Sequence, residues 1–325
     1  MTATTSITTT ATDAIELEAV PTEAALIEAY LAEIDGTEAT KRTYAAGLRK
    51  YTAWLEETGR GLLTVNRADI LAYRDGLEAA GLKAGTVNTY LAAARSFYRW
   101  TEAYGIFPNV AAGVRGLKAC ATGAKDALTV EQARKVVAVE GDRLKDLRDR
   151  AILELMARRG LRTCEIARAS IGDLRQIGGR AVLFVQGKGH AEADAFVVLG
   201  EECLEPIRAY LEARGESDPA APLFASVSNR NLGGRLTARS VSRIVAERLE
   251  ACGLKSARLT AHSLRHTAVT FALLGGATLQ EAQAMARHAN VETTLIYAHN
   301  IDRLEAGGER AVDNFFSTGQ RRRAA

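Results

Sequence analysis

Apolar residues recur every three or four positions through much of the N-terminal third of the chain, and polar residues fill the positions between them. That period is typical of amphipathic helices that bury one face. Thr37 before and Gly59 after the second such stretch are residues that commonly flank helices. The pattern predicts four helices, over residues 22–34, 37–58, 69–79 and 86–104. We therefore expect a compact all-helical domain over residues 21–107, after a disordered leader rich in Thr and Ala over residues 1–20.

The periodicity stops at residues 108–125, which contain proline, glycine and basic residues and which we interpret as an interdomain linker. Thr129 and Gln132 then form the sequence pattern of a capping box, which marks the start of a helix. Further helices are predicted over residues 130–139, 147–159, 202–213, 238–252 and in the last part of the domain. Strand patterns separated by glycines occur at residues 173–177, 181–185 and 195–199.

These patterns predict a mainly α protein with a second, mixed α+β domain over residues 126–316 that contains a small three-stranded antiparallel sheet. The closing residues 317–325 include three consecutive arginines and are expected to form a mobile basic tail. A chain of 325 residues is long enough for two such domains.

The net charge of +3 is unevenly distributed. Residues 1–36 contain seven of the 39 acidic residues and none of the 42 basic ones, so the rest of the chain has a net charge of +10. A basic surplus of this kind favours a DNA partner, because neutralising phosphates releases counterions.

The four cysteines are far apart and form no C-x-x-C pair, which argues against a disulfide framework or a zinc knuckle. No apolar run approaches the length of a membrane span, and the N-terminus lacks a basic region before an apolar core. We expect a cytoplasmic protein without a membrane partner.

Candidate chemistry is concentrated in residues 261–299. His262 and Arg265 are three positions apart and share one face of a helix. His288 and Tyr297 are nine positions apart, which would direct them to opposite sides of one straight helix. Asn290 is a good N-cap, so we expect a new helix to begin there and to bring Tyr297 back towards His288. A tyrosine surrounded by cations is suited to attack a phosphodiester.

Two further basic residues stand at predicted turns. Arg162 lies in G-L-R-T-C-E-I after a buried helix, where a surface or capping role is the simplest reading. Lys188 lies between two glycines, either as a solvated hairpin lysine or as a phosphate-loop lysine. The P-loop pattern fails because it requires glycine where Val182 stands and Ser or Thr at position 189.

His262 and His266 have the four-residue spacing of a zinc site. Ser263 stands where the zinc-protease motif requires glutamate, and no third ligand is close in sequence. We therefore expect no metal, and His266 is interpreted as packed or as supporting the site.

The series His262-x-x-Arg265, His288 and Tyr297 resembles the C-terminal signature of the tyrosine recombinase (phage integrase) family, in its Xer- and integrase-like branch. Arg162, Glu165 and Lys188 match the family's first arginine, the acidic residue that follows it and the active-site lysine. Arg287 stands where the family usually has glycine. The helical domain resembles the family's SAM-like core-binding domain, and the general resemblance runs over residues 22–316.

The resemblance implies a site-specific DNA recombinase. Tyr297 would attack the scissile phosphate and form a 3′-phosphotyrosine, with Arg162 and Arg265 at the non-bridging oxygens. His262 and His288 would donate to the phosphate or manage the tyrosine proton, Lys188 would act as general acid, and Glu165 would orient the group. Strand exchange would pass through a Holliday junction without a metal, ATP or other cofactor.

The resemblance also implies partners. Four protomers would act on two double-stranded DNA sites, and residues 300–316 would dock on a neighbouring protomer. Accessory DNA-bending or directionality proteins are a further class of partner. Candidate DNA contacts are Lys41, Arg42, Arg49, Lys50, Lys83, Arg95 and Arg99, with Arg287 as a contact to the DNA backbone.

Two alternatives use the same residues differently. A type IB topoisomerase shares the tyrosine and arginine chemistry but relaxes supercoils as a monomer. A noncatalytic DNA-binding regulator would keep the fold without the reaction. The residues leave integration, excision and dimer resolution equally open.

Overall fold

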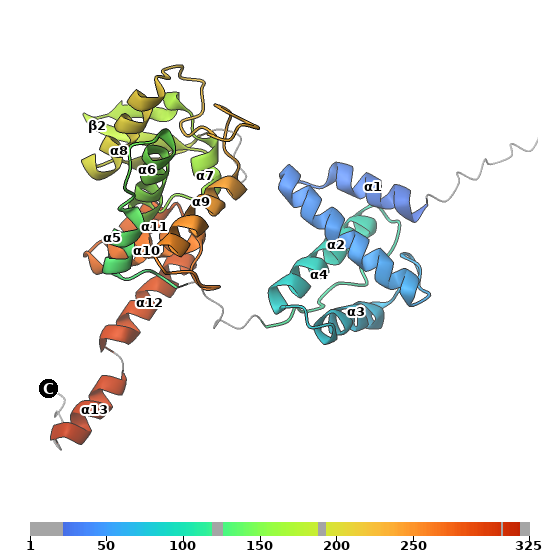
Figure 1. Ribbon diagram of the computed structural model, residues 1–325. Coiled ribbons are helices and arrows are strands. Elements are labelled where there is room, and N and C mark those ends of the chain that lie inside the picture. The colour runs from blue at the N-terminus through green and yellow to red at the C-terminus, as the bar shows by residue number, and fades with distance from the viewer. Residues whose placement is uncertain (1–21, 119–125, 188–192, 307, 319–325) are drawn as a thin grey trace, which may run out of the picture. The chain divides into compact units, whose positions relative to one another are not determined.

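The computed structural model describes residues 22–118, 126–187, 193–306 and 308–318 (Figure 1). The chain divides after Cys120 into two compact units. None of the helices in these described ranges is long and apolar enough to cross a membrane.

The first unit contains the four helices that the hydrophobic pattern predicts. They are α1 (Glu23–Glu33), α2 (Glu38–Glu57), α3 (Arg67–Ala79) and α4 (Ala84–Ala103). Thr22 and Thr37 accept hydrogen bonds from backbone N–H groups of the first turns of α1 and α2, as N-caps do. Helix α3 begins two residues earlier than predicted, because Asn66 and Asp69 form a reciprocal capping box around its first turn.

Buried aromatic rings form the centre of this unit. The hydroxyls of Tyr51 and Tyr98 lie 2.9 Å apart, and that of Tyr98 donates to the carbonyl of Leu62 at 2.9 Å. Tyr73 packs on Tyr51 with ring centroids 4.8 Å apart. Paired hydroxyls let Tyr51 and Tyr98 enter an apolar core without leaving their own polar atoms unsatisfied.

The chain after α4 remains packed on this unit through much of the predicted linker. Ala111 and Val114 are buried in its core. Arg95 donates to the carbonyl of Val114, and Asn88 pairs with both backbone groups of Leu117 at 2.7 and 2.9 Å.

The second unit combines a small sheet with helices. Its first elements are α5 (Val130–Val137), α6 (Leu144–Arg159), α7 (Thr163–Arg168), the short 3-10 helix η2 (Ile171–Asp173), β1 (Leu174–Ile177), β2 (Arg180–Val185) and β3 (Ala195–Val198). The strands pair antiparallel in the order β1-β2-β3, with Leu183 opposite both Leu174 and Val197. The predicted three-stranded antiparallel sheet is confirmed.

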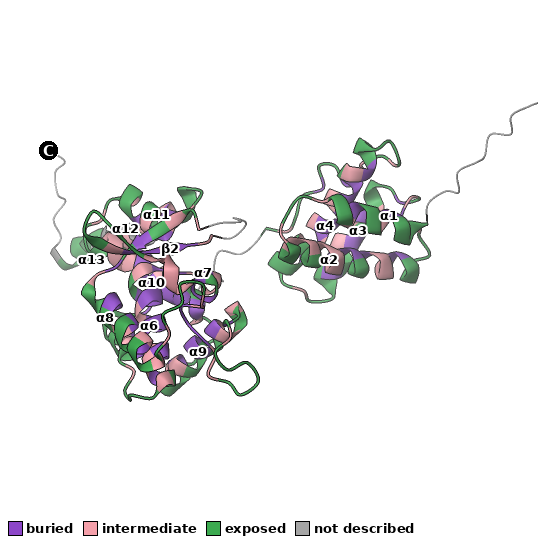
Figure 2. Ribbon diagram, turned by 90° about the horizontal axis from the view of Figure 1, so that it is seen from above, coloured by how far each residue is buried: buried purple, intermediate pink, exposed green. Residues whose placement is uncertain are grey.

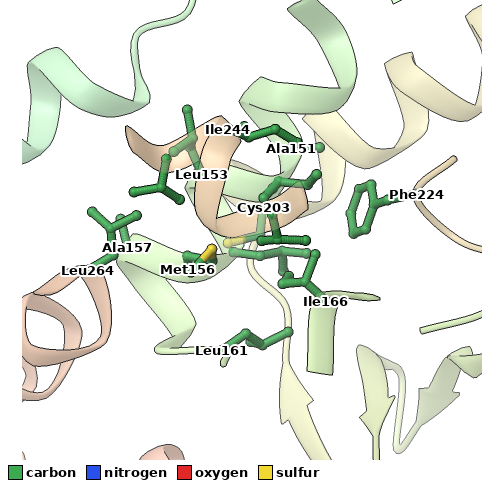
Figure 3. Close-up of a cluster of buried hydrophobic side chains, with 14 of the residues drawn as sticks. Ala151, Leu153, Met156, Ala157, Leu161, Ile166, Cys203, Phe224, Ile244 and Leu264 are labelled. Carbon is green, nitrogen blue, oxygen red and sulfur yellow. The ribbon is translucent and has the colours of Figure 1, made fainter. Parts of the chain in front are cut away.

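Helix α6 lies at the centre of this unit. Its residues Ile152, Leu153 and Met156 are fully buried, and Figure 2 colours the ribbon of the unit by how far each residue is buried. Figure 3 shows Met156 among side chains from α7, α8 (Glu201–Arg214), α9 (Ala238–Ala251) and α10 (Ala261–Leu274). This packing fixes the C-terminal end of α6, where the candidate site begins.

Three more helices complete the unit, namely α11 (Leu279–Ala286), α12 (Glu292–Ala306) and α13 (Gly308–Thr318). The predicted break before Tyr297 is confirmed: α11 ends at Ala286, and Asn290 accepts a hydrogen bond from the backbone of Glu292 at 2.9 Å. Helix α13 exposes Val312, Phe315 and Phe316, the last with 83% of its surface accessible.

Candidate active site

The turn between α6 and α7 presents Arg162. Gly160 ends α6 in the left-handed conformation at φ 62°, and a Cβ there would lie 3.4 Å from the Cβ of Ala268 on α10. Arg162 is the N-cap of α7, and both its backbone N–H and its guanidinium donate to the Glu165 carboxylate, at 2.7 and 2.8 Å. Glu165 is fully buried, whereas the Arg162 side chain is 30% exposed. The carboxylate therefore positions a guanidinium that solvent can reach.

Arg265 extends from α10 into the same region. It is 1% exposed, and its guanidinium donates to the carbonyl of Gly160 at 2.7 Å and to that of Ala286. Burial, together with the charges of Arg162 and Arg287, lowers the pKa of Arg265 to about 10. The group is still cationic at neutral pH, and it joins the ends of α6 and α11.

The turn between α11 and α12 presents His288. The side-chain amide of Gln283 donates to its carbonyl at 3.0 Å, and its Nδ1 lies 2.8 Å from the hydroxyl of buried Thr294. Burial, with the charges of Arg265 and Arg162 next, lowers the pKa of His288 to about 4. The imidazole is therefore neutral at physiological pH and able to accept a proton.

Tyr297 lies on α12 and faces back towards these groups. It is 9% exposed and packs with Val269 and Ala286 in a small apolar cluster. Its ring centroid is 6.3 Å from that of His288, and the two planes differ by 17°. Burial raises the pKa of Tyr297, and the charge of Arg265 opposes that shift. The phenol is protonated at neutral pH and needs a base to become a nucleophile.

His266, which the sequence predicts to be packed or to support the site, lies beside Tyr297. Its ring centroid lies 5.0 Å from that of Tyr297 and 4.5 Å from that of His262. Burial, followed by the charges of His262 and Arg265, lowers the pKa of His266 to about 4. The four-residue spacing from His262 was the signal that both rings share the face that meets Tyr297. Within the described ranges, no group of three potential metal ligands forms around them.

The cationic side chains also border open space. Arg162, His262 and Arg265 line a cavity of about 840 Å³. Forked guanidinium groups at such an opening suit a phosphate or another oxyanion, because they donate parallel hydrogen bonds and stay charged. Tyr297, beside the neutral imidazoles of His266 and His288 and under the charge of Arg265, provides a nucleophile with proton acceptors next to that guanidinium.

The other predicted residues occupy different surroundings. Lys188 lies outside the described residues. On the first unit Arg42, Arg49, Lys50, Lys83 and Arg99 are exposed. Lys41 and Arg95 are partly buried and donate to the carbonyls of Ala32 and Val114. Arg287 is turned inward, with its guanidinium on Glu165 at 2.8 Å.

The sequence matches two profiles of known protein families. The sequence profile of the phage integrase family matches residues 126–303, and that of the phage integrase N-terminal SAM-like domain matches residues 27–105. The tyrosine recombinase XerC of Pelobacter propionicus is 33% identical over 270 residues, which cover 82% of this chain and 86% of the relative. The tyrosine recombinase XerD of Rhizobium meliloti is 28% identical over 292 residues, 86% of this chain and 92% of the relative.

Solved structures share the fold. The XerH site-specific recombinase in a post-cleavage complex with its palindromic difH substrate matches with a TM-score of 0.69 at 19% identity, over 85% of this chain and 80% of that chain. A lambda integrase tetramer bound to a Holliday junction matches with a TM-score of 0.65 at 17% identity, over 84% of this chain and 76% of that chain. Since the family profile covers more than half of the chain and the XerC relative aligns over most of both sequences, the chain belongs to the phage integrase family of tyrosine recombinases.

Proposed function

We propose that the protein is a site-specific DNA recombinase in which Tyr297 is the nucleophile. The observation that carries the proposal is that Tyr297 packs beside His288 and is acted on by the charge of Arg265, while Arg162 donates to the backbone of the turn that presents His288. The XerC and XerD relatives are named as tyrosine recombinases, and the XerH structure is of a complex with its DNA substrate.

The reaction follows from the chemistry of these groups. The phenolic oxygen of Tyr297 forms a bond to phosphorus, and the bond from phosphorus to the 5′-oxygen breaks. The product is a 3′-phosphotyrosine, which conserves the energy of the phosphodiester in a covalent bond. A 5′-hydroxyl from another strand reverses the step and exchanges strands, so neither ATP nor a metal is required.

Arg162 and Arg265 stabilise the negative charge that develops on the non-bridging oxygens. A guanidinium has five N–H donors, so the two carbonyl bonds of Arg265 leave donors for a phosphate. Removing one preorganised donor of this kind typically costs about 2.7–4 kcal/mol of transition-state stabilisation.

Proton transfer is assigned to the neutral imidazole of His288, to His262 and to a lysine. His288, whose pKa is lowered to about 4, accepts the Tyr297 proton or relays it through His262. Lys188 protonates the departing 5′-oxygen. Glu165 stays ionised and orients Arg162 without reacting: burial raises its pKa, but the hydrogen bond and charge of Arg287, with Arg162, lower the pKa by more.

Assembly is part of the proposal. Four protomers bind two duplex sites, and α13 docks on a neighbouring protomer through its exposed apolar residues, Val312, Phe315 and Phe316. The lambda integrase structure, which is a tetramer on a Holliday junction, supports this arrangement. The exposed basic side chains of the first unit contact the DNA backbone.

The test begins by finding the DNA site. The protein is incubated with fragmented DNA, and the positions of covalent adducts are mapped. A nicked duplex carrying the mapped site then traps the adduct, because the short strand beyond the cut diffuses away. We expect wild-type protein to form a denaturant-resistant adduct and Tyr297→Phe to form none while still binding the duplex. Undiminished adduct formation by Tyr297→Phe would refute the proposal.

A second assay addresses the topoisomerase alternative. The wild-type protein is given a supercoiled plasmid with one site and a plasmid pair with two sites. Recombinant product that requires two sites supports a recombinase, whereas relaxation at one site without exchange supports a topoisomerase.

A further inference from the structure

Arg287 adopts an unusual backbone conformation. Within the described part of the chain it is the one residue other than glycine with positive φ, at 54°. Side chains with a Cβ rarely adopt the left-handed region, and glycine adopts it without cost. The C-cap of α11 is therefore an arginine at a position where glycine would avoid the unfavourable backbone conformation. This indicates that contacts of the arginine side chain compensate for the cost of that conformation.

The Arg287 guanidinium lies on the buried carboxylate of Glu165. Its Nη2 is 2.8 Å from Oε2, and its Nε is 3.2 Å from Oε1. Its other bonds go to the carbonyls of Met285 at 2.5 Å and Gly160 at 3.4 Å. The Arg287 side chain is 11% exposed and that of Glu165 is 0% exposed. A bidentate pair this deeply buried fixes both partners in one geometry.

Glu165 accepts two hydrogen bonds from Arg162, as many as it accepts from the Arg287 guanidinium. The backbone N–H and Nη1 of Arg162 donate to its two oxygens, so four N–H groups from two arginines surround one carboxylate. Arg162 Nη2 also lies 3.3 Å from the carbonyl of Arg287. The three residues form a closed ring that joins the turn presenting Arg162 to the turn presenting His288.

We propose that Arg287 is a positioning residue for the cleavage reaction: it completes the coordination of the Glu165 carboxylate and thereby fixes Arg162 relative to His288. This inference rests on the proposed function for its catalytic readout. It also assigns Arg287 an inward role in place of a contact to the DNA backbone.

Removing Arg287 leaves the buried Glu165 carboxylate with Arg162 as its remaining ion-pair partner. The charged groups that face Glu165 are Arg162 on its own turn, Arg287 on the α11 turn and Arg265 on α10. Without Arg287, burial raises the pKa of Glu165, and the carboxyl takes up a proton at higher pH. A protonated Glu165 no longer orients Arg162, so the cleavage rate of the variant falls as the pH is lowered.

The catalytic test uses full-length Arg287→Gly, Arg287→Lys and Glu165→Gln, with Arg208→Ala as control. Glycine suits the backbone of position 287, so this variant is expected to fold. Arg208 forms exposed ion pairs with Glu201 and Glu205 on α8. Its loss removes the same charge without removing Arg162 or Arg287, the ion-pair partners of Glu165. The rate of adduct formation is measured at saturating protein on the nicked duplex from pH 5 to pH 9, together with duplex affinity.

We expect Arg287→Gly to lower the rate at least 10-fold at pH 7, to keep duplex affinity within about twofold, and to shift the acidic limb of the pH profile towards neutrality. In the double variant Arg287→Gly/Glu165→Gln the acidic limb of the pH profile is expected to disappear, because the titrating carboxyl is absent. Arg287→Lys is expected to regain part of the rate that Arg287→Gly loses. A wild-type rate and pH profile for Arg287→Gly would overturn the inference. A several-fold loss of affinity with an unchanged rate at saturation would also overturn it, because it would assign Arg287 to the DNA backbone.

A second readout does not depend on catalysis. The thermal midpoints of wild type, Arg287→Gly, Glu165→Gln and the double variant form a cycle. We expect the double variant to lose clearly less than the sum of the single losses, and additive losses would overturn the pairing. If the wild-type protein forms no adduct, the proposed function fails while this cycle still decides whether Arg287 positions Glu165.

Discussion

His288 and Thr294 are joined by a hydrogen bond of 2.8 Å between the imidazole Nδ1 and the threonine hydroxyl. The bond spans the turn between α11 and α12, and the Thr294 side chain is fully buried. With Nδ1 engaged in this way, the other ring nitrogen of His288 is the one available for proton transfer at Tyr297.

Thr294→Val should therefore slow the reaction without disturbing the shape of the site. Valine has nearly the same volume but leaves Nδ1 of His288 without its partner, at a cost of about 1–3 kcal/mol in stability. We expect adduct formation to fall roughly 10- to 100-fold, since a ring in the wrong orientation or tautomer forfeits part of its acid–base contribution. Single-turnover adduct assays measure the rate. Thr294→Ser, which keeps the hydroxyl, should stay within about threefold of wild type, and equal rates for valine and serine would contradict the assignment.

The geometry of Arg265 leads to a second prediction. Its guanidinium bridges the carbonyls of Gly160 and Ala286, two acceptors that belong to different helix ends. The ammonium of lysine does not reproduce a planar fork. We expect Arg265→Lys to lower the adduct rate about 100- to 1000-fold, with duplex affinity nearly unchanged. A lysine variant with nearly wild-type cleavage would show that charge alone is sufficient at this position.

The hydrophobic pattern was sufficient to predict most of the fold. Helix period, caps such as Thr129 with Gln132, and glycine-separated strand patterns are local signals, and the elements follow them. The break at Asn290 was predictable for the same reason. Among the predicted site residues, His288 and Arg265 lie near Tyr297, and Arg162 donates to the turn that presents His288, whereas their catalytic roles stay predictions.

Side-chain direction was not predictable in the same way. Arg95 and Arg287 look like surface cations in sequence, yet each is turned towards an acceptor that only the folded chain provides. Val114 lies 19 residues from Arg95, and Glu165 lies 122 residues from Arg287. No local pattern encodes such a pairing, and a basic residue alone does not reveal whether its partner is a phosphate or a buried carboxylate.

The difference between inward and outward arginines is itself testable on the first unit. Arg95 is partly buried and donates to the carbonyl of Val114, whereas Arg49 is exposed on α2. We expect Arg95→Ala to lower the free energy of unfolding by about 1–2 kcal/mol, because a buried carbonyl loses its donor. Arg49→Ala should change it by less than about 0.5 kcal/mol.

The salt dependence of duplex affinity should change in Arg49→Ala and not in Arg95→Ala. Loss of one phosphate contact reduces the slope of log affinity against log salt by about one, so Arg49→Ala is expected to change that slope and Arg95→Ala to leave it unchanged. Titrations of a duplex at several salt concentrations measure both. A smaller slope for Arg95→Ala in a stably folded protein would assign Arg95 to the DNA.

The two neutral imidazoles predict how stability depends on pH. The pKa values of His266 and His288 are lowered from 6.5 to about 4 in the folded chain, mainly by burial. Below pH 6.5 the unfolded chain binds protons that the folded chain does not, so the free energy of unfolding decreases as the pH falls from 6.5 towards 4. Both rings are partly exposed, and we expect each to contribute on the order of 1 kcal/mol after allowance for solvent screening.

Denaturant unfolding of the full chain between pH 7 and pH 5 measures this slope. That window lies above the unfolded pKa of carboxyl groups, which lose their contribution at lower pH. His266→Gln should flatten the slope. An unchanged slope in both His266→Gln and His288→Gln would show that folding does not lower the pKa of these rings.

The exposed face of α13 leads to the last prediction. Val312, Phe315 and Phe316 are three and four residues apart, so they share one side of the helix, with exposed fractions of 53%, 49% and 83%. Burying a phenylalanine side chain against a neighbouring protomer contributes about 1.5–3 kcal/mol. We expect Phe315→Ser/Phe316→Ser to weaken formation of the complex of two duplexes at least 10-fold while binding of one duplex stays unchanged. Asn314→Ser changes the same helix without removing apolar surface and is the matched control. Both complexes are resolved by gel mobility or sedimentation, and equal assembly by the two variants would mean that α13 does not contact the neighbouring protomer through this face.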